Sequence, residues 1–345
     1  MARVIGDARG PLPAALRPLA VPASWAYGVG VRIHRAVASM RTPRDAGVPV
    51  ISVGNVATGG TGKTPFVRWT VGALEESGRI PAIAMRGYGA RRGLSDEAEE
   101  YRATLPRTPL AVGGDRASAI AEARARHPAI DAVVLDDGFQ HRALARALDI
   151  VLVDATRPAI DGALLPAGWL REPAEALHRA GVVVITRAER EDDRIADLVR
   201  RARGRGPDAW TRHAWNVVDR FVGVDPRPGI AADLTGMRVA VACAIGNPHA
   251  FARDVRAHGA EVAKERFARD HHAYSDAEVD AIAADASGLP VVVTGKDWAK
   301  IGPAVARSRG PAARCEWLIP RVGIEFVAGE GAVRSALARA LASPA

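Results

Sequence analysis

A glycine-rich segment ending in Gly62-Lys63-Thr64 has the residue types that bind the phosphates of a nucleotide. Glycines let backbone N–H groups surround phosphate oxygens, a lysine at this place reaches the β- and γ-phosphates, and the next hydroxyl is placed for Mg²⁺. We therefore predict a nucleoside triphosphate site with Mg²⁺ in this segment, here called the phosphate loop. Its residues are Ala57, Thr58, Gly59, Gly60, Thr61, Gly62, Lys63 and Thr64.

Two details of the composition bear on this prediction. Ala57 stands where the usual pattern has glycine. Of the 47 basic residues only four are lysines, so a lysine inside the loop is conspicuous. The larger, planar guanidinium of arginine cannot replace a compact ammonium there. The alternative, an accidental Gly-Lys-Thr in an ordinary turn, is disfavoured because the apolar run before the loop and the amphipathic stretch after it also fit.

Two consecutive acids, Asp136 and Asp137, follow the apolar run 132–135. A strand that ends in aspartate can place a carboxylate beside the Mg²⁺ that bridges the β- and γ-phosphates. Asp136 is the predicted direct ligand and Asp137 the supporting one. An acidic turn after a strand is common in proteins, so the interpretation depends on the phosphate loop that precedes it.

The surrounding sequence predicts the elements that position these residues. Short apolar, β-branched runs predict strands, and amphipathic stretches between them predict helices. The predicted strands are 48–55, 80–85, 110–112, 132–135, 150–154, 182–186, 237–244, 261–267 and 290–294, and the predicted helices are 66–74, 116–126, 247–258 and 276–286. This alternation indicates an α/β fold with a mostly parallel sheet covered by helices on both faces.

The chain has 345 residues, enough for two domains. We predict an N-terminal segment over 1–45, a phosphate-loop domain over 46–215 and a smaller α/β lobe over 216–345. The Pro- and Gly-rich stretches 204–208 and 225–229 predict the linker region. Two cysteines make no disulfide framework and indicate a reducing cytoplasm. No run approaches the length of a membrane span, and no signal peptide is recognisable.

The net charge of +8 predicts an anionic partner, either nucleic acid or an anionic membrane. Aromatic residues are only 5% and are not interleaved with basic stretches, which disfavours nucleic acid. The segment 24–40 can form a helix with an apolar, Trp-bearing side and an Arg/His side. Such a helix suits a membrane interface, but one packed on the core with a solvated basic face is the more frequent case.

Taken in order, the motifs resemble the tetraacyldisaccharide 4′-kinases of lipid A synthesis over residues 12 to 325. Beside the phosphate loop, the resemblance rests on Arg-Gly-Tyr-Gly (86–89), Asp-Asp-Gly-Phe-Gln-His (136–141), Leu-Leu-Pro-Ala-Gly (164–168), Leu-Arg-Glu-Pro (170–173), Asp-His-His-Ala-Tyr (270–274) and Thr-Gly-Lys-Asp (294–297). The resemblance implies a P-loop NTPase-like kinase that transfers the γ-phosphate of ATP to the 4′-hydroxyl of a lipid disaccharide 1-phosphate. It also implies a peripheral protein on the cytoplasmic face of the inner membrane, which favours the interfacial reading of the N-terminal helix. No obligate protein partner is evident.

The resemblance also suggests roles for residues outside the loop. It points to Asp96 with His271 as the base that receives the hydroxyl proton, with His272 and His141 as the histidines most easily confused with His271. Glu97 joins the predicted metal ligands. The predicted anion contacts are Arg86, Arg116 and Arg171, and the predicted nucleotide-associated residues are Lys296 and Asp297.

This sequence departs from the family pattern in places. Met85 precedes Arg-Gly-Tyr where serine is usual, the segment 89–96 is short, and 95–98 reads Ser-Asp-Glu-Ala. Two other classes of function remain open at this point. One is an ATPase acting on a protein or nucleic acid, which would leave the motifs at 164–173 without a purpose. The other is a membrane-binding protein with a degenerate nucleotide site, for which Ala57 is the sole support.

Overall fold

The computed structural model describes residues 17–40, 42–58, 61–87, 96–231, 233–245, 248–269 and 272–342. Their contacts form two compact units. Unit 1 comprises the described residues of 1–88, 105–213 and 324–345, and unit 2 those of 89–104 and 214–323. This differs from the contiguous division predicted at residue 215, because two long strands, β7 (Ala209–Val222) and β12 (Glu316–Ala328), each contribute residues to both units.

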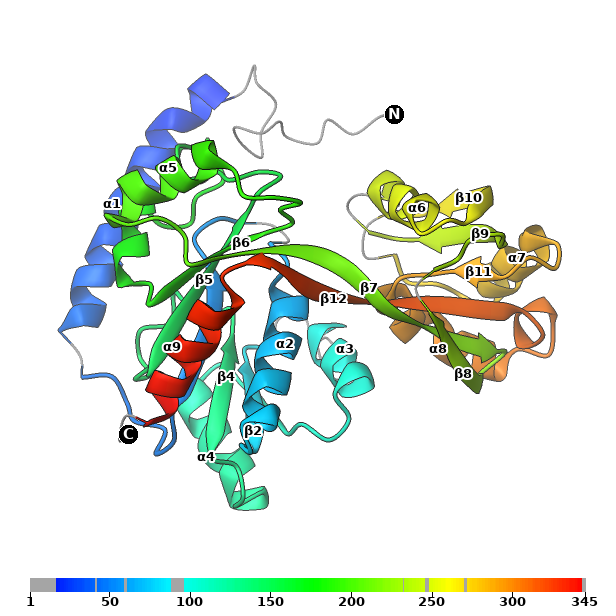
Figure 1. Cartoon of the computed structure of the whole chain (residues 1–345), viewed down its shortest axis with the longest axis horizontal. Coiled ribbons are helices and arrows are strands. Elements are labelled where there is room, and N and C mark those ends of the chain that lie inside the picture. The colour runs from blue at the N-terminus through cyan, green and yellow to red at the C-terminus, as the bar shows by residue number, and fades with distance from the viewer. Residues whose placement is uncertain are drawn as a thin grey trace. The chain divides into compact units, whose positions relative to one another are not determined.

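Unit 1 is built on a parallel sheet whose strand order is β7-β6-β5-β1-β4-β2-β3 (Figure 1). The strands are β1 (Val50–Asn55), β2 (Pro81–Met85), β3 (Leu110–Val112), β4 (Ala132–Asp136), β5 (Leu148–Asp154) and β6 (Val182–Thr186), with the first part of β7. Every residue of β1, β2, β4 and β6 is buried. Continuous apolar runs form such strands because helices cover both faces of a parallel sheet. The predicted fold class is confirmed.

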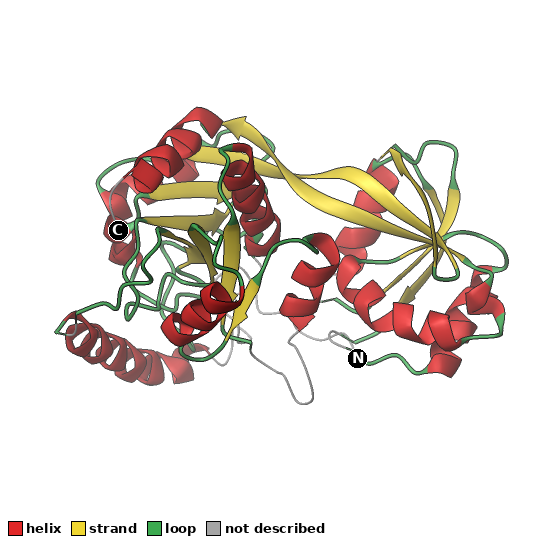
Figure 2. Cartoon of the chain, turned by 90° about the horizontal axis from the view of Figure 1, so that it is seen from below, coloured by secondary structure: helices red, strands yellow, loops and turns green. Residues whose placement is uncertain are grey.

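The helices of unit 1 lie on both sides of that sheet (Figure 2). They are α1 (Arg17–Ser39), α2 (Lys63–Glu76), α4 (Arg116–Arg126), the 3₁₀ helix η2 (Ala174–Arg179), α5 (Asp193–Arg203) and α9 (Glu330–Ala342). Helix α2 packs on β1 and β4, and α9 packs on β5. Side chains alternate along a strand, so Val50, Val133 and Leu135 point to the opposite face and form a core with Ile120 of α4.

Helix α1 is longer than the sequence predicts, since it runs through Pro22. A proline removes one backbone hydrogen bond, and here it lies close enough to the start for the helix to continue past it. The predicted start at residue 24 was therefore late. Among the described residues, no helix combines the length and the apolar character needed to cross a bilayer.

Unit 2 has a smaller sheet in the order β10-β9-β11-β12-β7, with β8 antiparallel to β7. Its further elements are β8 (Asp225–Ala231), β9 (Arg238–Cys243), β10 (Glu261–Phe267), β11 (Val291–Val292), α3 (Asp96–Thr104), α6 (Pro248–Ala257), α7 (Asp276–Ala286), α8 (Gly295–Arg307) and the 3₁₀ helix η3 (Pro311–Ala313). The linker prediction for 225–229 was wrong because β8 forms there. A strand paired on one side tolerates the prolines that suggested a linker.

Close packing of Gly54 fixes the backbone after β4 against the end of β1. A Cβ atom at Gly54 would lie 2.7 Å from the Cβ of Phe139 and 2.8 Å from its backbone nitrogen. We predict that Gly54→Ala lowers the free energy of unfolding by about 1–3 kcal/mol, because overpacking must shift backbone. Gly72→Ala is the matched control, since no atom lies within 4 Å of its Cβ position in α2.

Urea unfolding checks this prediction. The control should be more stable than the wild type by about 0.5–1 kcal/mol, because alanine favours a helix interior. Equal effects of the two substitutions would contradict the packing argument.

Candidate active site

Strand β1 leads into the phosphate loop and the neighbouring parallel strand β4 ends in Asp136, so the start of the loop and this aspartate lie at the same edge of the sheet of unit 1. The chain after β1 runs past β4 to β2, whereas the chain after β4 runs past β1 to β5, so the two connections leave in opposite directions. Ligands of open α/β sheets bind where such connections separate, at the carboxyl ends of the strands. Val53 and Asp136 share a register position, which brings the loop and this carboxylate to one place.

The described part of the phosphate loop is braced from two sides. Asn55 Nδ2 donates to Thr61 Oγ1 at 2.9 Å, and Thr186 Oγ1, at the end of β6, donates to the Thr61 carbonyl at 2.9 Å. Gly62 adopts a left-handed conformation, with φ of 79°, at the cap of α2. The glycine at this position is thus required by the backbone. Gly59 and Gly60, which we predicted as phosphate contacts, lie outside the described residues.

Ala57 fits its position without strain because its backbone pairs with another segment. Ala57 forms an antiparallel bridge with Leu170, and the neighbouring Arg171 N–H donates to the Val56 carbonyl at 2.8 Å. Thr58 N–H donates to the Trp169 carbonyl at 2.8 Å. This extended pairing needs no left-handed backbone, and residue 57 is not among those with positive φ. The missing glycine therefore does not distort the loop.

Asp137 joins the loop lysine to an arginine from the Leu-Arg-Glu-Pro motif. The Lys63 Nζ lies 3.5 Å from Asp137 Oδ1, and Arg171 Nη1 donates to Asp137 Oδ2 at 2.9 Å. Burial raises the pKa of Asp137, but the charges of Lys63 and Arg171 outweigh it, so the pKa lies below its usual range. Asp137 is therefore a carboxylate at neutral pH. It holds a left-handed backbone with φ of 50°, which is unusual for a residue with a side chain.

Asp136 and Thr64 provide hard oxygen donors of the kind that Mg²⁺ prefers. Asp136 is buried at the end of β4, and Thr64 lies in the first turn of α2. Among the described residues no group of three or more His, Cys, Asp or Glu gathers as a metal centre. Mg²⁺ usually takes one or two carboxylates and completes its shell with water and substrate phosphates. The residues present fit that ion rather than an all-protein metal cage.

Positive charge accumulates beside these acids. Arg116, buried at the start of α4, has a pKa lowered first by burial and then by the nearby charge of Arg86, and the carboxylates of Asp137 and Asp136 partly offset this. His141 has a pKa lowered to about 4 by burial and by Arg116. Arg116 and Arg171 thus both interact with Asp137, and Arg86 lies near Arg116. A buried cation such as Arg116, repelled by a second cation, is stabilised by an anionic ligand.

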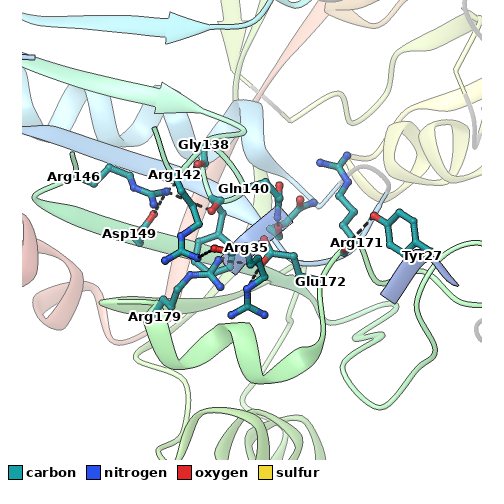
Figure 3. A network of polar contacts seen from close by, with 12 residues as sticks. Tyr27, Arg35, Gly138, Gln140, Arg142, Arg146, Asp149, Arg171, Glu172 and Arg179 are labelled. Carbon is teal, nitrogen blue, oxygen red and sulfur yellow. Dashed lines mark hydrogen bonds and ion pairs between the residues drawn. The ribbon is translucent and has the colours of Figure 1, made fainter. Parts of the chain in front are cut away.

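The backbone that carries the two aspartates is held by side chains that the sequence analysis did not single out. Gln140 Nε2 donates to the Asn55 carbonyl at 2.8 Å, and Arg146 Nη1 donates to the Gly138 carbonyl at 3.0 Å (Figure 3). Arg146 also pairs with Asp149 of β5 at 3.1 Å. These bonds fix the turn against the end of β1. A polar residue inside a matching motif was the available sequence signal for Gln140, whereas nothing marked Arg146 among 43 arginines.

The side chains of the predicted base, Asp96 and His271, are not among those that the structure describes. His271 falls outside the described residues, and Asp96 and Glu97 are the first residues of α3 in unit 2, with only their backbone described. The neighbouring His272 is engaged, since its Nε2 lies 3.0 Å from Glu278 Oε1 in the capping box of α7. His272 therefore has a carboxylate partner within unit 2, at the start of α7.

Asp297 does not have the surroundings of a nucleotide contact. It is buried near the start of α8, where Oδ1 accepts from Ala244 N–H at 3.0 Å and from the Tyr274 hydroxyl at 3.1 Å, and Oδ2 accepts from Thr294 Oγ1 at 2.6 Å. Burial raises its pKa despite these bonds. Asp297 thus connects Tyr274 and Ala244 to the start of α8 within unit 2, which is a structural role.

His213 is a residue of the site that the sequence did not reveal. It lies on β7, and a Cβ atom at Gly62 would come within 2.8 Å of its Nε2. Within the described chain that buried nitrogen has no hydrogen-bond partner. Burial and the charge of Arg187 lower the pKa of His213 to about 4. The ring is therefore neutral at pH 7 and packs behind the phosphate loop.

The low pKa of His213 predicts a pH dependence of stability. Between pH 6.5 and about 4 the unfolded chain binds a proton that the folded chain excludes, so this residue makes stability fall as the pH is lowered through that window. From pH 7.5 to pH 5 it should remove about 2 kcal/mol of the free energy of unfolding. His213→Gln should lose about that much less than the wild type over the same range, measured by urea unfolding at both pH values. Identical losses in the two proteins would show that His213 titrates normally.

The comparisons with known proteins agree with one another. A family model described as "Tetraacyldisaccharide-1-P 4'-kinase" matches residues 16–342. The tetraacyldisaccharide 4'-kinase of Anaeromyxobacter dehalogenans strain 2CP-C is 40% identical over 316 residues, which are 85% of this chain and 82% of that protein. The enzyme of the same name from Chlorobaculum tepidum is 34% identical over 277 residues, 74% of this chain and 77% of that protein.

A solved structure shows the same fold. The crystal structure of LpxK from Aquifex aeolicus in complex with ATP superimposes with a TM-score of 0.72. The superposition covers 94% of this chain and 99% of that one, at 22% sequence identity. At this identity the likeness is one of fold.

Proposed function

This chain belongs to the tetraacyldisaccharide-1-P 4′-kinase family, and we propose that Lys63, Asp136, Asp137 and Arg171 form the phosphate-transfer part of its active site. The protein is an ATP-dependent kinase that phosphorylates the 4′-hydroxyl of a tetraacyldisaccharide 1-phosphate in lipid A synthesis. The observation that carries our proposal is the Asp137 carboxylate, which lies between Lys63 and Arg171 beside the phosphate loop.

Phosphoryl transfer requires positioning and charge stabilisation more than covalent chemistry. The Lys63 ammonium and the loop amides stabilise negative charge on the β- and γ-phosphates, and this is needed most as the γ-phosphoryl group moves. Asp137 orients the lysine by an ion pair that also orders Arg171. Because the two cations share one carboxylate, each retains donors for phosphate oxygens.

Thr64 and Asp136 would hold Mg²⁺, which when bound neutralises phosphate charge and aligns the β- and γ-phosphates. Asp136 is buried and points from the end of a fully buried strand, so its position is fixed before the nucleotide binds. Glu97 remains a predicted further ligand, and its side chain is not described.

Arg86, Arg116 and Arg171 would receive the 1-phosphate or the transferred phosphate of the lipid. The support for this role is electrostatic. Arg116 is buried, and the nearby charge of Arg86 lowers the pKa of Arg116 further. Two aspartates only partly offset this positive charge. Arginine suits the task because its planar fork can bind a phosphate with two parallel hydrogen bonds.

The outer side of α1 would lie on the anionic surface of the inner membrane, at its cytoplasmic face. An i, i+4 series of apolar side chains is exposed along the helix, at positions 21, 25, 29, 33 and 37. Trp25 is 77% exposed and Ile33 60%. Such a stripe is costly in water and suits the interface where an acylated substrate is anchored.

Asp96 and His271 would together receive the proton of the acceptor hydroxyl. A carboxylate can orient an imidazole and stabilise its protonated form.

The kinase reaction itself tests the loop. Purified protein is incubated with labelled ATP, Mg²⁺ and a tetraacyldisaccharide 1-phosphate in detergent micelles, and the bisphosphorylated lipid is quantified. Lys63→Ala should reduce turnover by about 10²- to 10³-fold, since its charge is needed at the transition state. Lys63→Arg should not restore activity. Lys264→Ala, on β10 of unit 2, is the control and should turn over at the wild-type rate. If Lys63→Ala turns over within a few-fold of the wild type, the assignment of the nucleotide site is wrong.

The metal assignment is tested by removing one charge at a time. Asp136→Asn keeps the shape of the side chain but not its charge, so activity with Mg²⁺ should collapse and recover in part with Mn²⁺. Asp137→Asn should instead weaken the ion pairs of Lys63 and Arg171, with no recovery by Mn²⁺. If Mn²⁺ restores the second variant and not the first, the two roles are reversed.

A double-mutant cycle tests the base. If Asp96 and His271 act as one unit, Asp96→Ala, His271→Ala and the double variant should lose similar amounts of rate, because residues acting together are non-additive. The affinity for ATP should change little, since neither residue belongs to the phosphate loop. His272→Ala is the neighbouring control. Losses that multiply in the double variant would indicate independent roles, and a normal rate for His271→Ala would remove it from the mechanism.

A further inference from the structure

The inner side of α1 is fitted to the segment that contains the Leu-Leu-Pro-Ala-Gly motif. Ser24 Oγ donates to the Leu164 carbonyl at 3.0 Å and accepts from Ala167 N–H at 2.9 Å. A Cβ atom at Gly28 would lie 2.9 Å from Leu164 Cδ1, so the helix approaches as closely as a glycine allows. Ser24 and Gly28 are buried, unlike the exposed Trp25 and Ile33, so these two contacts face the protein. They fix the position of the helix along its axis.

Two further side chains of α1 reach the next motif, Arg171-Glu172 (Figure 3). The Tyr27 hydroxyl donates to the Arg171 carbonyl at 3.0 Å. The Arg35 Nε lies 3.8 Å from Glu172 Oε2, and the Arg35 carbonyl accepts from Arg142 Nη1 at 3.3 Å. Glu172 is only 4% exposed, so its charge needs the cations around it.

The same two residues also contact the acidic turn after β4. The Arg171 side chain binds Asp137, and its N–H donates to the Val56 carbonyl beside the phosphate loop. Glu172 pairs with Arg179 at 3.1 Å, and the Arg179 guanidinium lies 4.4 Å from the centre of the Phe139 ring. The backbone of Arg171 is therefore held by Tyr27 of α1 at its carbonyl and by Val56, directly after β1, at its N–H, while its side chain extends to Asp137.

We propose that Tyr27 and Arg35 are positioning residues through which α1 holds Arg171 on Asp137, so that α1 supports phosphoryl transfer directly. The inference rests on the role of Arg171 proposed above. Tyr27 acts on the carbonyl of Arg171 itself, and Arg35 acts on the adjacent Glu172. Neither residue touches the reacting atoms. Their effect on the rate passes through the guanidinium of Arg171, and it disappears when that guanidinium is removed.

A double-mutant cycle with Arg171→Ala tests this. Tyr27→Phe deletes one hydroxyl and Arg35→Gln one charge, and each should lower kcat/KM about fivefold, the rate equivalent of about 1 kcal/mol. In the Arg171→Ala background neither substitution should cause any further loss, because residues that act through one another are non-additive. Arg35→Lys should recover most of the loss caused by Arg35→Gln. Arg126→Gln, an exposed arginine on α4, is the matched control and should leave the rate unchanged.

The possible outcomes separate the inference from the function on which it rests. If Arg171→Ala is slow and the losses from Tyr27→Phe and Arg35→Gln multiply with it, the positioning role is wrong and the role of Arg171 stands. Wild-type rates for Tyr27→Phe and Arg35→Gln also overturn the inference alone. A wild-type rate for Arg171→Ala contradicts the proposed role of Arg171, and the inference falls with it. The inference and the role of Arg171 are both supported if the losses of rate in Tyr27→Phe and Arg35→Gln vanish in the Arg171→Ala background and Arg35→Lys recovers most of the rate.

Discussion

The ion pairs of Asp137 with Lys63 and Arg171 bring two cations together at the edge of a buried sheet. Without a carboxylate between them, these charges and the nearby Arg116 would repel one another. Asp137 can take this position because its backbone turns left-handed directly after β4. A hydrogen bond from Arg146 and the packing of Phe139 on Gly54 hold this turn in place. The charged site thus depends on a backbone conformation that apolar packing and buried hydrogen bonds maintain.

The same constraint joins segments that are far apart in the sequence. The start of the phosphate loop pairs with residues 169–171, and Arg171 extends from that pairing to Asp137. A single strand-like contact therefore sets the distance between the loop and the acidic turn. It also explains why alanine is accommodated at position 57, since an extended, bridged residue needs no glycine.

Helix α1 has two sides with different surroundings. Its outer side exposes apolar residues that suit a lipid interface, and its inner side is bonded to the segment carrying Arg171. A lipid kinase must bring a water-soluble nucleotide to an acceptor anchored in a membrane. In the arrangement proposed above, a single helix would both lie on the lipid surface and contact the segment that carries Arg171.

The sequence by itself determined the local elements and the chemistry of the loop. Helices α4 and α7 and strands β6 and β10 have the predicted bounds, because hydrophobic periodicity and capping residues act over a few neighbours. Family membership and kinase activity also followed from the motifs. The roles of Asp96 and His271 remain predictions, since the structure describes neither side chain. Only the tertiary structure decided that Arg171 meets Asp137, that His213 packs behind Gly62, and that 324–342 belongs to unit 1. Each of these depends on which distant segments lie side by side, and that is settled by the packing of the whole chain rather than by any local pattern.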